Sequence, residues 1–487
     1  MSRHKNVFGN PIHPKVSRDA HSKKQGYIRK FGDDGTKVYS LSAFDNPVLS
    51  PVFGVKNLEL HEGGEALDEK KGIVVGNIRM GFGHYRIAMA IASAVHQRGY
   101  TPYWFDLNAF QHSTGGKVVE HLNGLYSLGS RLSQKYALFN KLYWEPLNYE
   151  GFKKLSYNAA DQKIAELHAP LAVGLPKEMP FIATHAWPAQ AAIHAGMTNV
   201  INMIPDNWPM ALHLAEGSLH TVQSPSSLLG YRLLREMAGR GELSKPMPAK
   251  DICCVGHYID HELTANLEAD TAARLARFKA KAARRLLISV GGAGAQFEII
   301  AELLRSYTGM LAAGKLAVYL NVGDHTSVWD HLKAAVPELE GLATTHFDDW
   351  EGTKAFCNSA LTQNVTGLHV FRHANKFSAV YSTNLLMRSC DVLITKPSEL
   401  AFYPVPKLFI KRVGGHERWG AIRSAELGDG TYEMENLAAA KQVLDLMIQE
   451  DDILSVQCDY ILRAHKAGVY NGAYEIVERA LQRSGRS

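Results

Sequence analysis

Two series of short apolar runs, separated by longer segments of helical character, limit what this chain can fold into. The first series reads GIVVG, from Gly72, then PYWFDL, PFIATH, NVINMI, HTVQS and DICCVG, with a long helical region up to about Leu167. Apolar strands that alternate with helices form parallel sheets, and the helices cover both faces of such sheets. A doubly wound α/β domain is therefore predicted from about Lys71 onward.

The second series follows a charged, alanine-rich segment without glycine or proline, Glu262–Arg284, which is typical of a helix that leaves a domain. Its strands read RRLLISVGG, KLAVYLNVG, LHVFRH, CDVLITKP and PKLFIKR, and helices are expected from Leu437 to Arg483. We expect two doubly wound, Rossmann-like domains, residues 71–262 and 263–487. Residues 1–70 are predicted to be a polar, partly disordered extension.

The composition excludes several classes of protein. The chain has 487 residues, of which 46% are hydrophobic and 21% charged, as in a folded protein with more than one core. A net charge of +5 is small for this length and argues against a dedicated nucleic-acid-binding protein. No run of about eighteen apolar residues is present, and the polar N-terminus lacks the apolar core of a secretory signal. We therefore expect a cytoplasmic protein.

The sequence gives no indication of a metal site. The five cysteines include the adjacent pair Cys253 and Cys254, but no spacing typical of zinc binding or of a disulfide framework. His257 and His261 lie four residues apart without the residue order of a zinc-protease helix. No Asp-x-Asp motif is present. We expect reduced thiols, no metal and no cofactor apart from a co-substrate.

The stretch GNIRMGFGHYRIA joins the first strand to a helix with regularly spaced isoleucines and a valine. Gly81, Gly83 and His84 therefore lie in a strand-to-helix turn at the carboxyl edge of a parallel sheet, where ligands of such folds bind. The glycines allow a ligand to approach closely. The histidine either transfers a proton or caps the helix.

Two nucleotide-binding motifs are weaker interpretations. A dinucleotide fingerprint would use Asp106 as its acid, but Arg86 replaces its third glycine, so a Rossmann dehydrogenase is the weaker hypothesis. GMLAAGKL, from Gly309, resembles a phosphate loop. Leu316 replaces the metal-binding hydroxyl there, and the run precedes a strand, so we interpret it as a helix end.

The second domain carries a glycine-rich turn of its own, SVGGAGAQ, Ser289–Gln296. Its N–H groups either hold a phosphate or form a tight turn without a ligand. Further along, five polar side chains are expected around the ends of two strands: Lys396, Ser398, Glu399, His416 and Glu417. Glu399 either offers its two oxygens to a pair of sugar hydroxyls or is a first-turn acid of a helix.

Taken in order, these motifs resemble the two-domain glycosyltransferases that include monogalactosyldiacylglycerol synthases, processive diacylglycerol glucosyltransferases and the N-acetylglucosaminyltransferase that completes lipid II. GFGHYRIAMAIA is similar to the glycine-glycine-histidine motif of their acceptor domain, FIATHAWPAQAA to their Thr-His-Pro segment, and IPDNWPMALHLAEGSLHTVQS to their Thr-Asp strand end. SVGGAGAQ is similar to their phosphate turn, and YSTNLLMRSCDVLITKP to the helix and strand before their Thr-Lys-Pro. The match begins near Lys71.

The sequence departs from that family in two places. After Pro397, SELAF replaces two glycines and a threonine-containing helix start. In GGHERWGA, Gly420 stands where the family has asparagine, so the resemblance does not name the sugar.

The resemblance implies the GT-B fold, in which two Rossmann-like domains face a central cleft. It implies inverting, metal-independent transfer from a UDP-sugar, bound by the C-terminal domain, to an acceptor hydroxyl at the N-terminal domain. His84 is then the base, Glu399 holds the ribose, and the other donor contacts are Gly292, Gly294, Ala295, Phe371, Lys396, Ser398, His416 and Glu417. The acceptor contacts are Gly81, Gly83, His185, Asp206 and Trp208, with a core role as the alternative for His185.

The segment LNGLYSLGSRLSQKYALFNKLYWEPLNYEGFKK mixes basic and aromatic residues. Such a composition suits either an anionic membrane surface or an ordinary amphipathic helix that packs on its own domain. With a lipid acceptor, the protein would be peripheral on the cytoplasmic membrane face.

Two other classes of function are consistent with the same motifs. A nucleotide-sugar epimerase of the same fold would turn over the donor without an acceptor. A protein that had kept the fold and lost catalysis would only bind the nucleotide-sugar, and the missing glycines after Pro397 favour that alternative.

Overall fold

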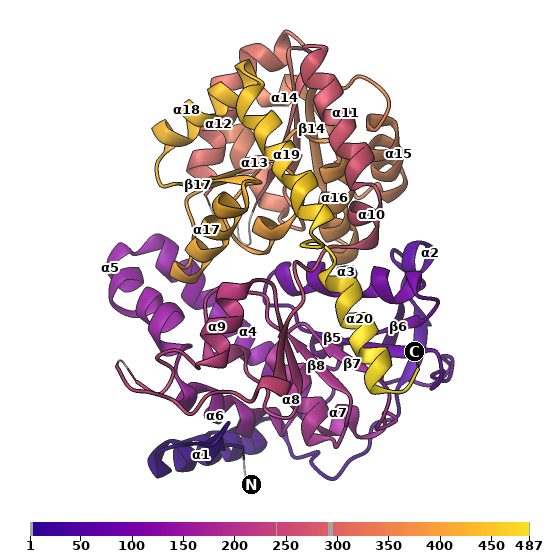
Figure 1. Cartoon of the computed structure of the whole chain (residues 1–487), viewed down its shortest axis with the longest axis vertical. Coiled ribbons are helices and arrows are strands. Elements are labelled where there is room, and N and C mark those ends of the chain that lie inside the picture. The colour runs from indigo at the N-terminus through magenta and orange to yellow at the C-terminus, as the bar shows by residue number, and fades with distance from the viewer. Residues whose placement is uncertain (1–2, 240, 291–295, 487) are drawn as a thin grey trace. The chain divides into compact units, whose positions relative to one another are not determined.

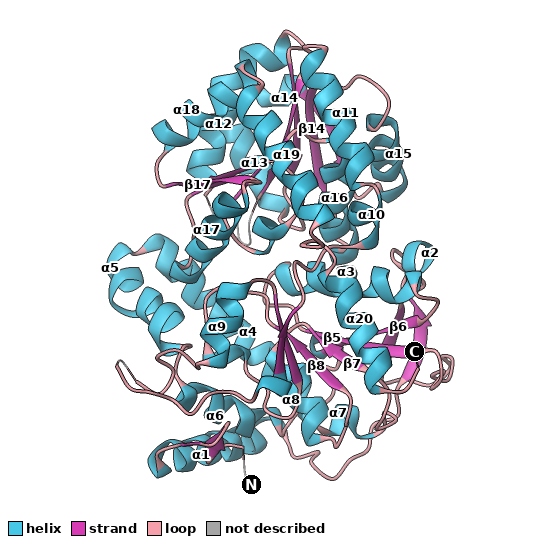
Figure 2. Ribbon diagram, viewed as in Figure 1, coloured by secondary structure: helices cyan, strands magenta, loops and turns pink. Residues whose placement is uncertain are grey.

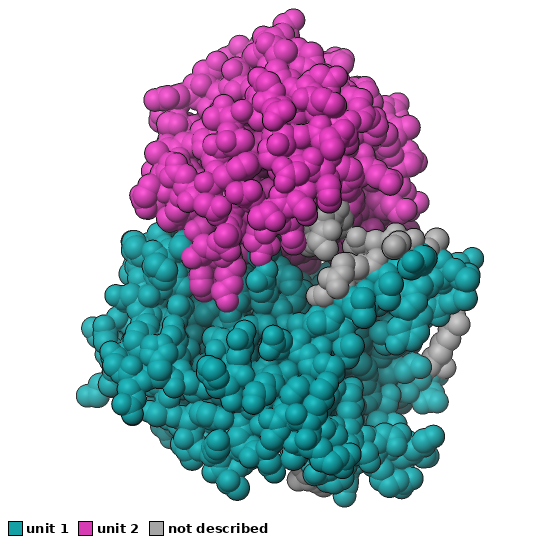
Figure 3. All heavy atoms as spheres, turned by 180° about the vertical axis from the view of Figure 1, so that it is seen from behind, with its two compact units in different colours: residues 1–260, 471–487 teal, residues 261–470 magenta. Residues whose placement is uncertain are grey.

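The computed structural model describes residues 3–239, 241–290 and 296–486. The chain folds into two compact units (Figure 3), each with one large sheet. Unit 1 comprises Met1–Asp260 together with Asn471–Ser487, and unit 2 comprises His261–Tyr470. Unit 2 is therefore an insertion within the sequence of unit 1.

Unit 1 contains an eight-stranded sheet in the order β10-β9-β8-β7-β5-β6-β4-β3. Figure 2 labels its strands β5, β6, β7 and β8. Neighbouring strands are parallel except for the antiparallel pair of β3 and β4. The central strands are buried along their whole length, because helices cover both faces. The strands are β3 (Ser42–Asp45), β4 (Lys56–Glu59), β5 (Gly72–Asn77), β6 (Thr101–Asp106), β7 (Phe181–Ala183), β8 (Val200–Met203), β9 (Leu219–Val222) and β10 (Ile252–Cys254), with a separate hairpin of β1 (Asn6–Val7) and β2 (Asn10–Pro11).

The helices of unit 1 follow the strands in alternation. The α-helices are α1 (Pro14–Phe31), α2 (Ser50–Phe53), α3 (Gly83–Gln97), α4 (Thr114–Lys135), α5 (Ala137–Phe139), α6 (Leu155–Ala165), α7 (Pro170–Val173), α8 (Ala186–His194), α9 (Pro225–Arg232) and α20 (Gly472–Arg483). Shorter helical turns are η1 (Leu107–Ala109), η2 (Asn140–Trp144), η3 (Leu147–Gly151), η4 (Ala211–His213) and η5 (Ala249–Asp251).

Helix α20 belongs to unit 1, where it lies beside α3 (Figure 1). Its small and aliphatic face is buried, and Asn199 Nδ2 donates to the Ala480 carbonyl at 2.9 Å. Arg98 of the segment after α3 pairs with Glu478 at 2.6 Å. The sequence analysis placed this helix in the second domain. The structure has it in unit 1 instead, because it packs on the apolar surface of α3.

The residues before β5 are also part of unit 1. β4 pairs with β6, β3 forms the edge of the sheet, and α1 packs against α6 and α4. Val7 and Phe8 are buried in a hydrophobic cluster with Tyr231. Where the sequence analysis expected a partly disordered extension, the structure therefore has two strands, a hairpin and a long helix.

Unit 2 contains a seven-stranded parallel sheet in the order β13-β14-β12-β11-β15-β16-β17. Strands β12, β15 and β16 are buried on both faces. The strands are β11 (Arg284–Ser289), β12 (Leu316–Asn321), β13 (Ala343–Phe347), β14 (Gly367–Arg372), β15 (Val392–Thr395), β16 (Lys407–Ile410) and β17 (Gly430–Met434).

The helices of unit 2 complete a second alternating series. They are α10 (His261–Ala265), α11 (Leu267–Lys279), α12 (Phe297–Ala312), α13 (Thr326–Ala335), α14 (Leu339–Leu342), α15 (Trp350–Ala360), α16 (Lys376–Ser389), α17 (Arg418–Leu427), α18 (Leu437–Gln449) and α19 (Asp452–Lys466), with the 3-10 turns η7 (Glu399–Phe402) and η8 (Gly415–Glu417). The predicted fold class, two doubly wound Rossmann-like domains as in GT-B proteins, is confirmed.

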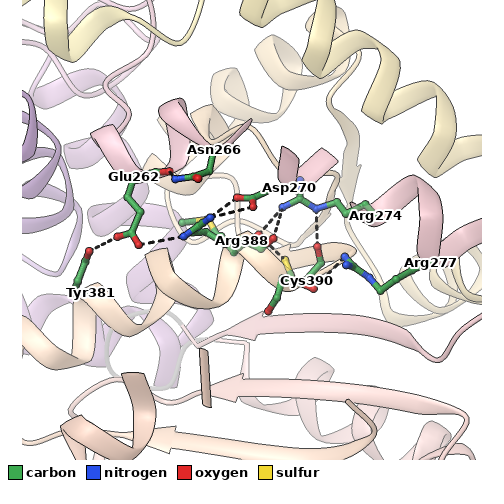
Figure 4. Close-up of polar contacts among 10 residues, drawn as sticks. Glu262, Asn266, Asp270, Arg274, Arg277, Tyr381, Arg388 and Cys390 are labelled. Carbon is green, nitrogen blue, oxygen red and sulfur yellow. Dashed lines mark hydrogen bonds and ion pairs between the residues drawn. The ribbon is translucent and has the colours of Figure 1, made fainter. Parts of the chain in front are cut away.

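Polar contacts fasten the first helices of unit 2 to α16 (Figure 4). Arg388 of α16 pairs with Glu262 at 3.3 Å and with Asp270 at 3.0 Å. Arg274 Nε donates to the carbonyl of Cys390 at 2.7 Å, directly before β15. These contacts hold α10, α11 and α16 together, and with them the strand whose carboxyl end carries candidate site residues.

Each sheet reverses its winding direction at one place. In unit 1 the chain passes from β5 to β6 on one side and later to β7 on the other, so β5 and β7 flank the reversal. In unit 2 the corresponding strands are β11 and β15. Ligands of doubly wound sheets bind at the carboxyl ends of the strands beside such a reversal.

Candidate functional site

The connection from β5 to α3 is held by two side chains from neighbouring elements. The backbone N–H of Arg79 donates to Asn108 Oδ1 at 2.6 Å, and Asn123 Nδ2 donates to the Arg79 carbonyl at 2.9 Å. Gly81 is exposed and has a φ of +109°, a conformation that favours glycine. The turn therefore presents Gly83 and His84 at the winding reversal of unit 1.

His84 lies in the first turn of α3, and its ring is oriented by the backbone of the neighbouring strand. Its Nδ1 lies 2.7 Å from the carbonyl oxygen of Thr184, the residue after β7. Because a carbonyl can only accept, Nδ1 carries the hydrogen, and the lone pair of the neutral ring lies on Nε2. The half-buried ring thus has one defined basic atom.

His185, which was expected to contact the acceptor, is buried beneath His84. The two rings meet edge to face with centroids 4.9 Å apart, and His185 Nδ1 accepts from the backbone N–H of Trp187 at 3.0 Å, capping α8. Burial, together with His84, His213 and His168, holds the pKa of His185 well below its usual value of 6.5. His185 is therefore a neutral support for His84, and the core alternative of the sequence analysis describes its observed surroundings.

Asp206 and Trp208 follow β8, on the far side of β7. Asp206 pairs with Nε2 of His213 at 3.2 Å, and its side chain is 30% exposed. Trp208 is only 5% exposed and stacks on Tyr149 with centroids 5.1 Å apart. Neighbouring side chains cover the ring of Trp208, and its contact with an acceptor stays a prediction.

Asp106, the acid of the alternative dehydrogenase fingerprint, is buried with both oxygens occupied. One oxygen accepts from the Tyr85 hydroxyl, and the other accepts from the backbone N–H of Asn108 at 2.9 Å. A ribose-binding carboxylate has to offer its oxygens to the ligand. The geometry of Asp106 therefore disfavours the dehydrogenase hypothesis.

In unit 2, the residues after β15 and β16 meet at the carboxyl edge of the sheet. The ammonium of Lys396 pairs with Oε1 of Glu417, and Glu417 Oε2 accepts from the backbone N–H groups of Val413 at 2.8 Å and Gly414 at 3.2 Å. Burial acts to raise the pKa of Glu417, but Lys396, His416 and these hydrogen bonds hold it below its usual value of 4.5.

The other predicted donor residues lie around this pair. Ser398 and Glu399 are half-buried at the start of η7, and His416 lies in η8 with its Nδ1 buried and without a hydrogen-bond partner among the described residues. Gln296 Nε2 donates to the Lys411 carbonyl at 2.9 Å, which ties the start of α12 to the connection after β16. Gly292, Gly294 and Ala295 lie outside the described residues.

Phe371, which was expected to flank the nucleobase, has a buried side chain. Its side chain is 0% exposed at the end of β14 and stacks on His346 with centroids 4.5 Å apart. Phe356 packs against the same ring at 5.3 Å. The ring is therefore part of the core of unit 2.

Gly420 is a glycine for a steric reason. A Cβ at this position of α17 would lie 2.7 Å from the carbonyl oxygen of Pro397, in the segment between β15 and η7. An asparagine at this position does not fit this backbone, so Gly420 and the segment after Pro397 belong together.

The structure thus brings the candidate residues together in two groups, one in each unit. His84 and His185 touch at the edge of unit 1, and Lys396 and Glu417 pair at the edge of unit 2. His213, the partner of Asp206, was missed by the sequence analysis, because a histidine ten positions after a strand end carries no pattern. The role of Thr184 was also missed, since it acts through its backbone carbonyl.

Residues 3–239, 241–290 and 296–486 contain no cluster of three or more histidine, cysteine or acidic side chains arranged for a metal ion. Within the same residues, no helix combines the length and the apolar character needed to cross a membrane.

Residues 6–233 match a family described as a domain of unknown function (DUF6937), and residues 247–481 match a second one (DUF6938). The first match includes the segment before β5, in agreement with its place in unit 1. No curated protein matches the chain.

Several solved structures share a distant likeness with most of the chain. A UDP-GlcNAc 2-epimerase from Neisseria meningitidis, bound to UDP-GlcNAc, is 9% identical with a TM-score of 0.46, over 84% of this chain and 100% of that one. An α,α-trehalose-phosphate synthase (UDP-forming) from Burkholderia vietnamiensis is 12% identical with a TM-score of 0.41, over 85% and 100%. The glycosyltransferase VinC in complex with DTDP is 12% identical with a TM-score of 0.42, over 85% and 100%. Likenesses this distant leave the reaction open.

Proposed function

We propose that this protein is a glycosyltransferase that moves a sugar from a nucleoside-diphosphate sugar, in our assignment a UDP-sugar, to an acceptor hydroxyl. Unit 2 binds the donor and unit 1 activates the acceptor. The transfer inverts the anomeric centre and uses no metal. The fold and the order of the motifs are consistent with this function, and the residues at the two sheet edges support it.

The observation that carries the proposal is the orientation of His84. Its Nδ1–H is committed to the Thr184 carbonyl at 2.7 Å, so the neutral ring accepts a proton at Nε2 only. The adjacent His185 is kept neutral by burial and does not compete for that proton. A histidine with one defined basic atom, at the ligand-binding edge of a doubly wound sheet, suits a general base.

The chemistry then has one step. The acceptor hydroxyl gives its proton to Nε2 of His84 while its oxygen forms a bond to the anomeric carbon. The bond between that carbon and the diphosphate oxygen breaks, and its electron pair leaves with the nucleoside diphosphate. Lys396 and the N-terminus of α12 stabilise the negative charge on the leaving group.

The proposal is tested with the full-length protein and a panel of nucleotide-sugars. We expect at least one UDP-sugar to raise the melting temperature and to support transfer to an added hydroxyl acceptor. His84→Ala is expected to lower kcat about 10²–10⁴-fold with donor binding unchanged. His112→Ala, which removes an exposed histidine of the same unit, serves as the control.

Other outcomes of this experiment separate the alternatives. Turnover of donor without acceptor, followed by NMR, would identify an epimerase. Binding of a nucleotide-sugar without any turnover would identify a binding protein. If no nucleotide-sugar protects the protein, the donor assignment is wrong, and if His84→Ala turns over like the wild type, the base assignment is wrong.

We further propose that the acceptor is a lipid, presented by an anionic membrane surface on the cytoplasmic side. The supporting observation is a group of large apolar side chains exposed on the segment from α4 to η2: Leu125, Leu128, Tyr136, Leu138, Leu142 and Tyr143. Lys141 is exposed in the same segment, and Lys154 is exposed just after η3. Exposed apolar side chains beside lysines are typical of surfaces that rest on anionic lipid.

Vesicle sedimentation tests this part separately. We expect binding to phosphatidylglycerol vesicles, weaker binding to phosphatidylcholine vesicles, and a loss of at least tenfold in the double variant Leu138→Gln/Leu142→Gln. Val456→Gln, an exposed apolar residue of unit 2, is the matched control. Equal binding of the wild type and the double variant would contradict the proposed membrane contact.

A further inference from the structure

Glu417 is more completely engaged by the protein than a sugar-binding carboxylate would be. Its Oε2 accepts from the N–H groups of Val413 at 2.8 Å and Gly414 at 3.2 Å, and its Oε1 faces the ammonium of Lys396. Its side chain is only 8% exposed. A ligand that approached this edge of the sheet would therefore meet little of the carboxylate.

The N–H contacts also define where the carboxylate stands. Val413 and Gly414 lie in the connection that leaves β16, and Glu417 closes the η8 turn that follows in the same connection. Hydrogen bonds to two consecutive N–H groups leave a carboxylate little freedom. Glu417 is consequently a fixed negative charge at the carboxyl end of β16.

Lys396 follows the neighbouring strand, β15, and its ammonium group pairs with the fixed carboxylate of Glu417. The lysine lies beside the winding reversal of unit 2, and its side chain is 18% exposed. A largely buried ammonium is costly without a counter-charge, and Glu417 supplies one. The pair thus keeps a lysine ammonium at the place where doubly wound sheets bind their ligands.

The surrounding charges favour an anionic ligand. The connection from β16 to α17 carries Lys411 and Arg412, and α17 begins with Arg418, whereas the connection itself has one carboxylate, that of Glu417. Arg412 is paired with Glu433 of β17 at 2.5 Å, so the excess positive charge comes from Lys411 and Arg418. The N-terminus of α12 is tied to this connection through Gln296 and Lys411. Lysine ammonium groups and helix N-termini are common ligands of phosphate groups.

We propose that Glu417 is a positioning residue that holds Lys396 against the diphosphate of the donor, and that Glu417 does not bind the sugar. The inference rests on the proposed function and gives the two residues different roles. Lys396 contacts the ligand through its ammonium group, and Glu417 acts through Lys396. The ligand class that the pair recognises is a nucleoside diphosphate, with or without an attached sugar.

Binding of UDP and UMP to the full-length protein, measured by calorimetry, tests the proposal because neither probe contains a sugar. Glu417→Gln and Lys396→Met are each expected to weaken UDP binding about tenfold, the usual effect of losing one charge-assisted hydrogen bond. UMP binding is expected to change less than threefold, because UMP lacks the second phosphate. The double variant is expected to bind UDP no more weakly than Lys396→Met alone, since Glu417 acts through Lys396.

Two variants act as controls. Lys396→Arg keeps the charge and is expected to bind UDP within about threefold of the wild type. Glu435→Gln removes an exposed carboxylate near the same connection, 72% exposed, and is expected to leave UDP binding unchanged. If Glu417→Gln does not fold, Glu417→Asp retracts the carboxylate by one carbon and is expected to weaken UDP binding in the same direction.

Three results would overturn the inference. They are unchanged UDP binding in Lys396→Met, unchanged UDP binding in Glu417→Gln with weakened UDP-sugar binding, and multiplicative losses in the double variant. A wild type that binds neither UDP nor UMP would instead contradict the proposed function.

Discussion

Asp161 is a carboxylic acid in the core of unit 1, three contacts away from His84. Burial raises its pKa from 3.8 to about 7, against the opposing effects of Trp187 and Lys23. Its Oδ2 accepts from the indole N–H of Trp187 at 3.1 Å, and the Trp187 ring packs edge to face on His185. The Asp161 carboxyl therefore changes from neutral to charged near pH 7, within the pH range of ordinary buffers.

We predict that Asp161→Asn stabilises the protein at high pH only. The folded protein binds the proton more tightly than the unfolded chain, so stability falls as the pH rises from about 4 to 7 and stays low above that. Three pKa units correspond to about 4 kcal/mol, the upper limit of the gain in the free energy of unfolding at pH 8.5. Urea unfolding of the wild type and the variant at pH 4.5 and 8.5 measures this gain in the free energy of unfolding. A gain of equal size at both pH values would contradict the assigned pKa.

For single residues, the sequence predicted where a residue lies in the fold better than which groups its side chain contacts. His84 was found because a strand and a helix bracket it. The contact that orients it comes from the backbone of Thr184, a hundred positions away, and every residue carries such a carbonyl. Phe371 was placed at the correct strand end, but its burial was not foreseen, since β14 is only partly buried and its pattern does not reveal which of its rings are covered.

At the scale of elements, α17 lies so close to the segment after β15 that one position tolerates no side chain. We predict that Gly420→Asn lowers the free energy of unfolding of unit 2 by about 1–3 kcal/mol, as overpacking does, and weakens UDP binding by moving Lys396. Chemical unfolding and calorimetry measure the two effects. Glu426→Asn, at an exposed position in the last turn of α17, is the matched control, and equal behaviour of both variants would contradict a steric role for Gly420.

The elements that sequence reasoning found and missed differ in burial. The continuous apolar strands were all found, because burial on both faces requires such runs. β13 was missed, since it is an edge strand whose threonines are exposed, and β3 and β4 were missed for their mixed composition. The return of α20 to unit 1 was also missed, because an amphipathic pattern shows that a helix has a partner without showing which partner.

At the scale of the whole molecule, unit 1 depends on a helix from the opposite end of the sequence. We predict that removing residues 471–487 destabilises unit 1 by about 3 kcal/mol or more, because Ile476 and Val477 alone each contribute about 1.5–3 kcal/mol when buried. Hydrogen exchange is expected to increase in α3 and to stay unchanged in α12. Glu475→Gln, on the exposed side of α20, is the control. Unchanged exchange in α3 would contradict the dependence.

The position of α20 also sets an order of events during protein synthesis. Chains grow at about 5–20 residues per second, and domains generally fold as their sequences emerge. Unit 2 is one uninterrupted segment, His261–Tyr470, and is complete before α20 has been translated. The apolar surface of α3 therefore stays exposed until all of unit 2 has been translated. During that interval it offers a binding site for a chaperone. The unit that is translated first is the one that finishes folding last.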